Sequence, residues 1–199
     1  RRHISDEDIN RLVETLSVPL NFEMAATGEM QKIALRHKPH AVCIVPEKRE
    51  ERTTEGGLDV VQDDNRLAHF IAPLREAGSR VSIFIAADQR QIDAAKRIGA
   101  QVIELHAGAY CDLHAEGRLE ESDAELERLR EMSSYAHSLG LEVHVGHGLT
   151  YKTVKPVAAF PEVMELNIGH FLIGEAIFLG LQPAISEMRR LMDEARGLL

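Results

Sequence analysis

Two segments of the chain place histidine beside glycine at points where a strand is expected to end. Gly-His-Gly at residues 146–148 follows the alternating residues 141–145, and Gly-His at residues 169–170 follows residues 164–168, where another strand is expected. Imidazole titrates near neutral pH, and glycine lets a ligand approach the backbone closely. A βα turn with a surface histidine explains the first segment equally well when it is taken alone. Two such segments after consecutive strands favour a site at one end of a sheet.

Carboxylates on two other expected strands add candidate acids and bases. Glu23 lies within residues 20–24, where burial in an apolar strand would raise its pKa into a useful range. A salt-bridged or solvent-facing residue remains an equally good reading of Glu23. Glu104 and His106 stand two residues apart at the end of a strand, so their side chains share a face. These residue types allow general acid/base chemistry.

The second Gly-His segment also suits an anion. Gly169 and His170 lead into residues 171–179, an apolar run that is expected to be a helix. The first N–H groups of a helix have no intrahelical acceptor, and the helix dipole favours negative charge there. The pattern predicts a phosphate site at this point, with a simple tight turn at Gly169 as the alternative.

A regular alternation of strands and helices must position these residues. Strands are predicted at residues 20–24, 41–45, 81–85, 101–105, 141–145 and 164–168, with helices between them. The pattern Ser5 to Asp8 predicts a capping box, and Pro73 predicts a break or kink in the helix around it. A polar loop is expected after residues 106–110. The alternation indicates an α/β protein, either a doubly wound sheet or a (β/α)8 TIM barrel. Because glycine-rich nucleotide loops are lacking and the candidates end several different strands, the barrel is favoured.

Composition limits the class of protein. A chain of 199 residues with 44% hydrophobic content suits one domain, and its net charge of −9 argues against a general nucleic-acid partner. We find neither an apolar run of transmembrane length nor a secretory signal. Cys43 and Cys111 lack a metal-type spacing and fit a reducing compartment. These features predict a cytoplasmic protein without a membrane partner.

Five segments together resemble the pyridoxine 5′-phosphate synthase family. They run through the chain in the family's order and are Asn21-Phe-Glu-Met24, Val45-Pro-Glu-Lys-Arg49, Thr53-Thr-Glu-Gly-Gly-Leu-Asp59, Gly146-His-Gly-Leu-Thr-Tyr151 and Glu165-Leu-Asn-Ile-Gly-His170. The resemblance implies a (β/α)8 barrel that condenses 1-deoxy-D-xylulose 5-phosphate with 3-amino-2-oxopropyl phosphate, releasing phosphate and water. It implies no metal or organic cofactor. It also implies a homo-oligomer, an octamer built from dimers.

The resemblance assigns roles residue by residue. Glu23 matches a general acid/base, Glu104 a site carboxylate, and His147 the proton donor of the later eliminations. Contacts to the phosphorylated substrates match His3, Thr53, Gly148, Gly169 and His170. The polar residues 46–59 would form a lid that excludes water.

Two strand-helix units that open the family's barrel have no match in this chain. We therefore expect one barrel domain over residues 1–199 that is incomplete at its N-terminus, with six of eight strands visible. Two alternatives stay open. One is a metal-dependent barrel lyase or epimerase, whose ligands would be Glu23, Glu104, His106, His144 and His147. The other is a non-catalytic protein of the same fold.

Overall fold

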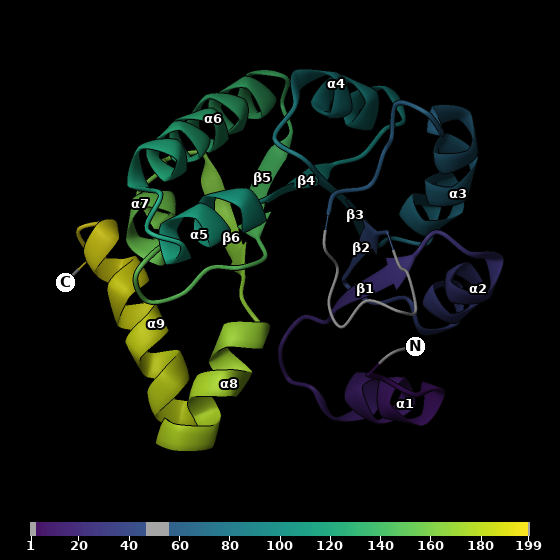
Figure 1. Cartoon of the computed structure of the whole chain (residues 1–199). Helices are drawn as coiled ribbons and strands as arrows, with labels where there is room; N and C mark the ends of the chain where they lie inside the picture. The colour runs from purple at the N-terminus through teal and green to yellow at the C-terminus, as the bar shows by residue number, and fades with distance from the viewer. Residues whose placement is uncertain (1–2, 47–55, 199) are drawn as a thin grey trace. The chain divides into compact units, whose positions relative to one another are not determined.

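The computed structural model describes residues 3–46 and 56–198 and has an α/β fold in which strands and helices alternate (Figure 1). The chain divides into two compact units, which are described separately below. Unit 1 comprises residues 1–86 and 90–103, and unit 2 comprises residues 87–89 and 104–199. The expectation of a single barrel domain over residues 1–199 stays a prediction.

Unit 1 contains three adjacent parallel strands and the helices that follow them. Its elements are α1 (Asp6–Thr15), β1 (Asn21–Ala25), α2 (Gly28–His37), β2 (Ala41–Val45), α3 (Asp64–Glu76), β3 (Arg80–Ile85) and α4 (Gln89–Arg97). Every residue of the central strand β2 is buried, as expected when helices cover a parallel sheet on its faces. Helices α2 and α3 pack against each other, α2 also against β1 and α3 against β3.

Local sequence explains where the first helices begin. At α1, the Ser5 Oγ accepts from the Asp8 N–H at 3.3 Å while the Ser5 N–H donates to the Asp8 carboxylate at 2.9 Å. This reciprocal pair is the predicted capping box. At α2, the Thr27 hydroxyl accepts from the Met30 N–H at 3.3 Å. Both caps satisfy backbone donors that a helix start leaves without partners.

The predicted break at Pro73 is wrong, because α3 continues through this residue to Glu76. Pro73 lies in the last turn of the helix, where its missing N–H removes one hydrogen bond, the one to the His69 carbonyl. Leu67, Ile71 and Leu74 are buried on one side of α3, and this packing outweighs the local penalty. Tertiary contacts here override a backbone preference.

Unit 2 carries the remaining elements, and β4 (Val102–His106) leads into it. They are α5 (Gly108–Ala115), α6 (Leu119–Ser138), β5 (Glu142–Gly146), α7 (Val154–Ala158), β6 (Val163–Asn167), α8 (His170–Leu179) and α9 (Leu181–Ala195). β5 and β6 are parallel, with Val145 opposite Leu166 and Gly146 opposite Asn167. Where a polar loop was expected after residues 106–110, helix α5 instead continues to Ala115. None of the helices described is long and apolar enough to cross a membrane.

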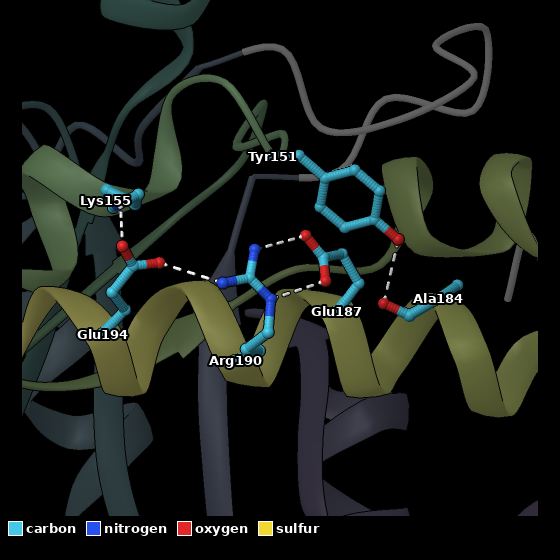
Figure 2. Close-up of polar contacts among 6 residues, drawn as sticks. All are labelled: Tyr151, Lys155, Ala184, Glu187, Arg190 and Glu194. Carbon is cyan, nitrogen blue, oxygen red and sulfur yellow. Dashed lines mark hydrogen bonds and ion pairs between the residues drawn. The ribbon is translucent and has the colours of Figure 1, made fainter. Parts of the chain in front are cut away.

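Helix α9 is held against α7 by an apolar contact with a polar border. Val154, Met188 and Leu191 are buried together between the two helices. Around them, the Tyr151 hydroxyl donates to the Ala184 carbonyl at 3.0 Å, and a chain of ion pairs joins Lys155, Glu194, Arg190 and Glu187 (Figure 2). Because exposed ion pairs contribute little, the apolar contact supplies most of the stabilisation.

Candidate active site

Glu104 is a buried carboxylate that its neighbours hold in place. It lies on β4 with only 4% of its surface exposed. Its Oε2 accepts a hydrogen bond of 2.8 Å from the Asn167 side-chain amide at the end of β6. Its Oε1 occupies the place where a Cβ at Gly146 would otherwise stand. A residue larger than glycine at the end of β5 would therefore displace the carboxylate, so three strand ends jointly define its position.

His147 comes directly after the last residue of β5, in a loop of unusual backbone conformation. His147 has φ of +71° and Gly148 has φ of +88°, both in the left-handed region. Glycine adopts this conformation freely, whereas a histidine there is uncommon and is held by its surroundings. The Ala107 N–H donates to the Gly146 carbonyl at 2.8 Å, and the His147 N–H donates to the Asn167 carbonyl at 3.4 Å. These bonds fix the loop to the ends of the neighbouring strands.

The imidazole of His106 lies against the imidazole of His147. Their ring centroids are 4.8 Å apart, and the rings are tilted by 43°. Burial, and then the charge of His147, lower the pKa of His106 to about 4. His106 is consequently neutral near pH 7. His106 and Glu104 thus share a strand end as predicted.

Helix α5 closes one side of this group. The Tyr110 hydroxyl donates to the Thr153 carbonyl at 3.2 Å, and the Cys111 thiol lies 3.7 Å from the Thr153 hydroxyl. A Cβ at Gly148 would approach the Cys111 side chain to 3.0 Å, so this loop packs directly on the helix. Burial raises the pKa of the Cys111 thiol to about 11, so the thiol is protonated near neutral pH and packs as an apolar group.

Gly169 and His170 lie at the N-terminus of α8, the position at which an anion site is predicted. Gly169 is the residue before α8, and its carbonyl accepts from the Ile173 N–H at 3.0 Å. Both residues are exposed, and a Cβ built at Gly169 would meet nothing within 4 Å. The space around the Gly169 Cα is therefore open at the start of the helix, where an anion could approach. Anion binding itself stays a prediction.

Three of the predicted site residues belong to unit 1. Glu23 lies on β1 opposite Cys43 and on the same face of the sheet, beside the buried cluster of Cys43, Val45 and Phe84. The Glu23 side chain reaches solvent, yet desolvation by the surrounding protein raises its pKa. The direction of this shift is the predicted one, and the exposed side chain also agrees with the solvent-facing alternative. His3 is exposed just before α1, whereas Thr53 and most of the expected lid lie outside the described residues.

His144 has a different setting from the one a metal site would need. It is 2% exposed, and its Nε2 lies 2.7 Å from a Glu142 oxygen while its Nδ1 lies 3.5 Å from a Glu165 oxygen. Within residues 3–46 and 56–198, no three His, Cys, Asp or Glu side chains are grouped so that they could hold a metal ion. The described geometry thus gives no support to the metal-dependent alternative.

Sequence reasoning overlooked two residues that shape this site. Asn167 binds Glu104 directly, and its position at the end of a predicted strand was the available signal. Gly108 allows the two imidazoles to approach, and only its place directly after a strand hinted at this role. Both contributions depend on which strands are neighbours, which no local pattern reveals.

Comparison with known proteins places this arrangement in a family. The family model described as "Pyridoxal phosphate biosynthesis protein PdxJ" matches residues 1–194. The chain belongs to the PdxJ family. A relative from Ruegeria pomeroyi, named pyridoxine 5′-phosphate synthase, is 82% identical over 197 residues, which cover 99% of this chain and 79% of the relative. A relative of the same name from Cereibacter sphaeroides is 69% identical over 196 residues, covering 98% of this chain and 78% of its own.

Solved structures outside the PdxJ family share the fold at low sequence identity. A 3-keto-L-gulonate-6-phosphate decarboxylase from Vibrio cholerae superposes with a TM-score of 0.65 and 14% identity, over 95% of this chain and 79% of its own. An HpcH/HpaI aldolase/citrate lyase family protein from Burkholderia cenocepacia gives a TM-score of 0.52, also at 14% identity. These likenesses concern the fold alone.

Proposed function

We propose that the chain condenses 1-deoxy-D-xylulose 5-phosphate with 3-amino-2-oxopropyl phosphate to form pyridoxine 5′-phosphate by general acid/base catalysis. The observation that carries the proposal is the group at the ends of β4, β5 and β6. There a fixed carboxylate, Glu104, and a strained, half-buried histidine, His147, lie among glycines whose small size lets the neighbouring side chains pack this closely. Ring closure requires imine formation, dehydration and phosphate loss, and each of these steps moves protons.

Each residue has a role that its environment supports. Glu104 stays in place and offers negative charge to a cationic imine intermediate. His147 donates a proton to the leaving oxygen, which departs as the carbon–oxygen bond breaks. Glu23 exchanges protons with the reacting carbons, and its raised pKa brings it nearer to the working pH. His3 and Thr53 contact the deoxyxylulose phosphate in this scheme.

The phosphate of the amino-ketone substrate binds at the start of α8. Gly169 and His170 supply backbone donors at the N-terminus of a ten-residue helix, and Gly148 contacts a phosphate-bearing substrate. Because the space in front of Gly169 is open, a branched side chain there would obstruct the ligand and leave the protein packing unchanged.

We also infer that the six strands belong to a (β/α)8 barrel and that the enzyme is a cytoplasmic homo-oligomer. Ultracentrifugation tests the assembly.

The direct test is an activity assay of the purified chain with both substrates. We expect pyridoxine 5′-phosphate, detected by chromatography, to form together with an equimolar amount of inorganic phosphate. Omitting either substrate is the control. A relative named pyridoxine 5′-phosphate synthase is assayed in parallel. If the relative forms product and the folded chain forms none in the same time, the proposal is wrong for this chain.

Gly169→Val tests the phosphate site separately. We expect it to weaken binding of 3-amino-2-oxopropyl phosphate by about tenfold or more, roughly the value of one charge-assisted hydrogen bond, with little change in thermal stability. Gly174→Ala is the matched control, because Gly174 lies in the same helix and its added Cβ also meets nothing within 4 Å. Unchanged affinity in the Gly169→Val variant, measured by calorimetry, would move the phosphate to another site.

A further inference from the structure

The contact between His106 and His147 is built into the backbone of unit 2. His106 ends β4, and His147 stands in the loop after β5. The N–H of Ala107 donates to the carbonyl of Gly146 at 2.8 Å, so each histidine is adjacent to one partner of the same hydrogen bond. This bond sets the separation of the two loops and thereby brings the rings to 4.8 Å.

Gly108 is the residue that makes the contact possible. A Cβ at this position would come within 2.5 Å of both Cε1 and Nε2 of His106 and within 3.3 Å of Cδ2 of His147. Real Cβ atoms do not approach other atoms to 2.5 Å, so any larger residue would push the His106 ring away. Gly108 opens helix α5 with a backbone that other residues could adopt, since its φ is not positive. Its small size, and not its flexibility, is therefore what the site uses.

The backbone conformation of His147 explains why contact with a second ring matters for this side chain. With φ of +71° this residue is in a conformation that favours glycine, and glycine follows it in the chain. A loop with this backbone does not by itself fix the rotamer of an imidazole. The ring of His106 packs against one side of the His147 ring and restricts the directions in which its N–H bonds can point.

We propose that His106 is a positioning residue, which packs its ring against His147 and so holds the His147 imidazole in the orientation for proton donation. The inference rests on the proposed function only in taking His147 as the donor. In that step the His147 N–H bond breaks, a new O–H bond forms on the leaving oxygen, and the neutral His147 later regains a proton from solvent. His106 neither gains nor loses a proton.

The charges around the pair agree with this division of roles. The groups beside His106 are the imidazole of His147 and the positive end of α5, which begins at Gly108. Burial and the neighbouring imidazole lower the pKa of His106 to about 4, so it brings no second positive charge to the donor near pH 7. A charged residue at position 106 would instead oppose protonation of His147.

Three variants separate packing from proton transfer. His106→Phe keeps a ring of similar size and removes the ionisable nitrogens, whereas His106→Ala removes the ring. Gly108→Ala keeps both histidines and displaces the His106 ring. His137→Ala, at an exposed position on α6, is the control. We expect His106→Ala and Gly108→Ala to lower kcat by about tenfold to a hundredfold with KM values changed less than threefold, because misorientation of a catalytic group slows the chemical step. His106→Phe should stay within threefold of the parent.

Two activity outcomes would overturn the proposal. If His106→Phe is as slow as His106→Ala and one limb of its pH–rate profile disappears, His106 itself transfers a proton. If His106→Ala turns over at the parent rate, the ring contact has no role. Should His106→Ala fail to fold, Gly108→Ala and His106→Phe still decide between these results.

A second measurement needs no turnover and remains decisive if the proposed function is wrong. Histidine-labelled protein is titrated by NMR, and the tautomer, the chemical shifts and the titration midpoint of His147 are compared among the variants. We expect His106→Phe to preserve the environment of His147 and His106→Ala to alter it. Identical His147 spectra in the parent and in the His106→Ala variant would refute the positioning role, whereas absence of product from the parent protein would refute only the proposed function.

Discussion

Glu23 and Glu104 are both glutamates on strands, one in each unit, and their surroundings differ. Glu104 is buried, accepts a hydrogen bond from Asn167 and fills the space that Gly146 leaves. Glu23 reaches solvent beside an apolar cluster, and its pKa is raised by desolvation. A carboxylate that neighbours hold in one position suits electrostatic stabilisation, whereas one that water can reach and whose proton is bound more tightly suits proton exchange. In the proposed mechanism, the same residue type serves two roles because its surroundings differ.

The largest expected effect tests the role of Glu23. Glu23→Gln keeps the size and polarity of the side chain but cannot exchange a proton. We therefore expect kcat to fall by about a hundredfold or more, which is the usual range for loss of a general acid/base. Turnover is measured with both substrates, and circular dichroism checks that the fold is intact. A variant with near-normal kcat would remove Glu23 from the catalytic group.

The next effect tests how firmly Glu104 is held. Gly146→Ala places a methyl group on the Glu104 Oε1 and must break the bond to Asn167 or displace the strand. We expect the free energy of unfolding to drop by about 1–3 kcal/mol, the cost of a buried polar group that loses its partner. Gly174→Ala, in open space within α8, should instead raise it by about 0.5–1 kcal/mol. Denaturant titration of both variants makes the comparison, and equal changes would contradict it.

A third experiment converts the hydrogen bond of Glu104 into a repulsion. Asn167→Asp sets a second carboxylate beside the first, which raises the apparent pKa of the pair in the folded state above its unfolded value. The folded state then binds the extra proton more tightly, so relative stability is greatest near pH 4 and is lost as the pH rises through the raised pKa. Unfolding is measured from pH 4 to pH 8. Asn167→Ala removes the donor without adding charge, and a similar pH trend in that variant would rule out the electrostatic cause.

The smallest expected effect concerns Glu23 and pH. Because its folded pKa is raised above the unfolded value, protonated Glu23 favours the folded state. Relative to Glu23→Gln, the parent protein should therefore lose stability as the pH rises from about 4 through the raised pKa. Solvent around the side chain screens part of this effect. Parallel melting curves of parent and variant at each pH provide the measurement, and the opposite slope would show that Glu23 is stabilised in its charged form.

The residues themselves determined much of the local structure. Apolar alternation located all six strands to within two residues, and the Ser5–Asp8 pattern placed the first cap because its atoms lie within one helical turn. The helix starting at His170 and the shared strand end of Glu104 and His106 followed from the same short-range rules. Family resemblance added the roles of Glu23, His147 and the phosphate contacts, which periodicity does not provide.

Tertiary structure alone decided how the candidate residues meet. The partner of Glu104 is Asn167, 63 positions away, and the space for its carboxylate is created by Gly146 on the neighbouring strand. Helix α5 forms where the polar sequence indicated a loop, since Tyr110 and Cys111 are buried against residues near Thr153. These outcomes depend on strand register and packing between distant segments. Local propensity fixes which elements form, whereas only their assembly fixes which side chains share a site.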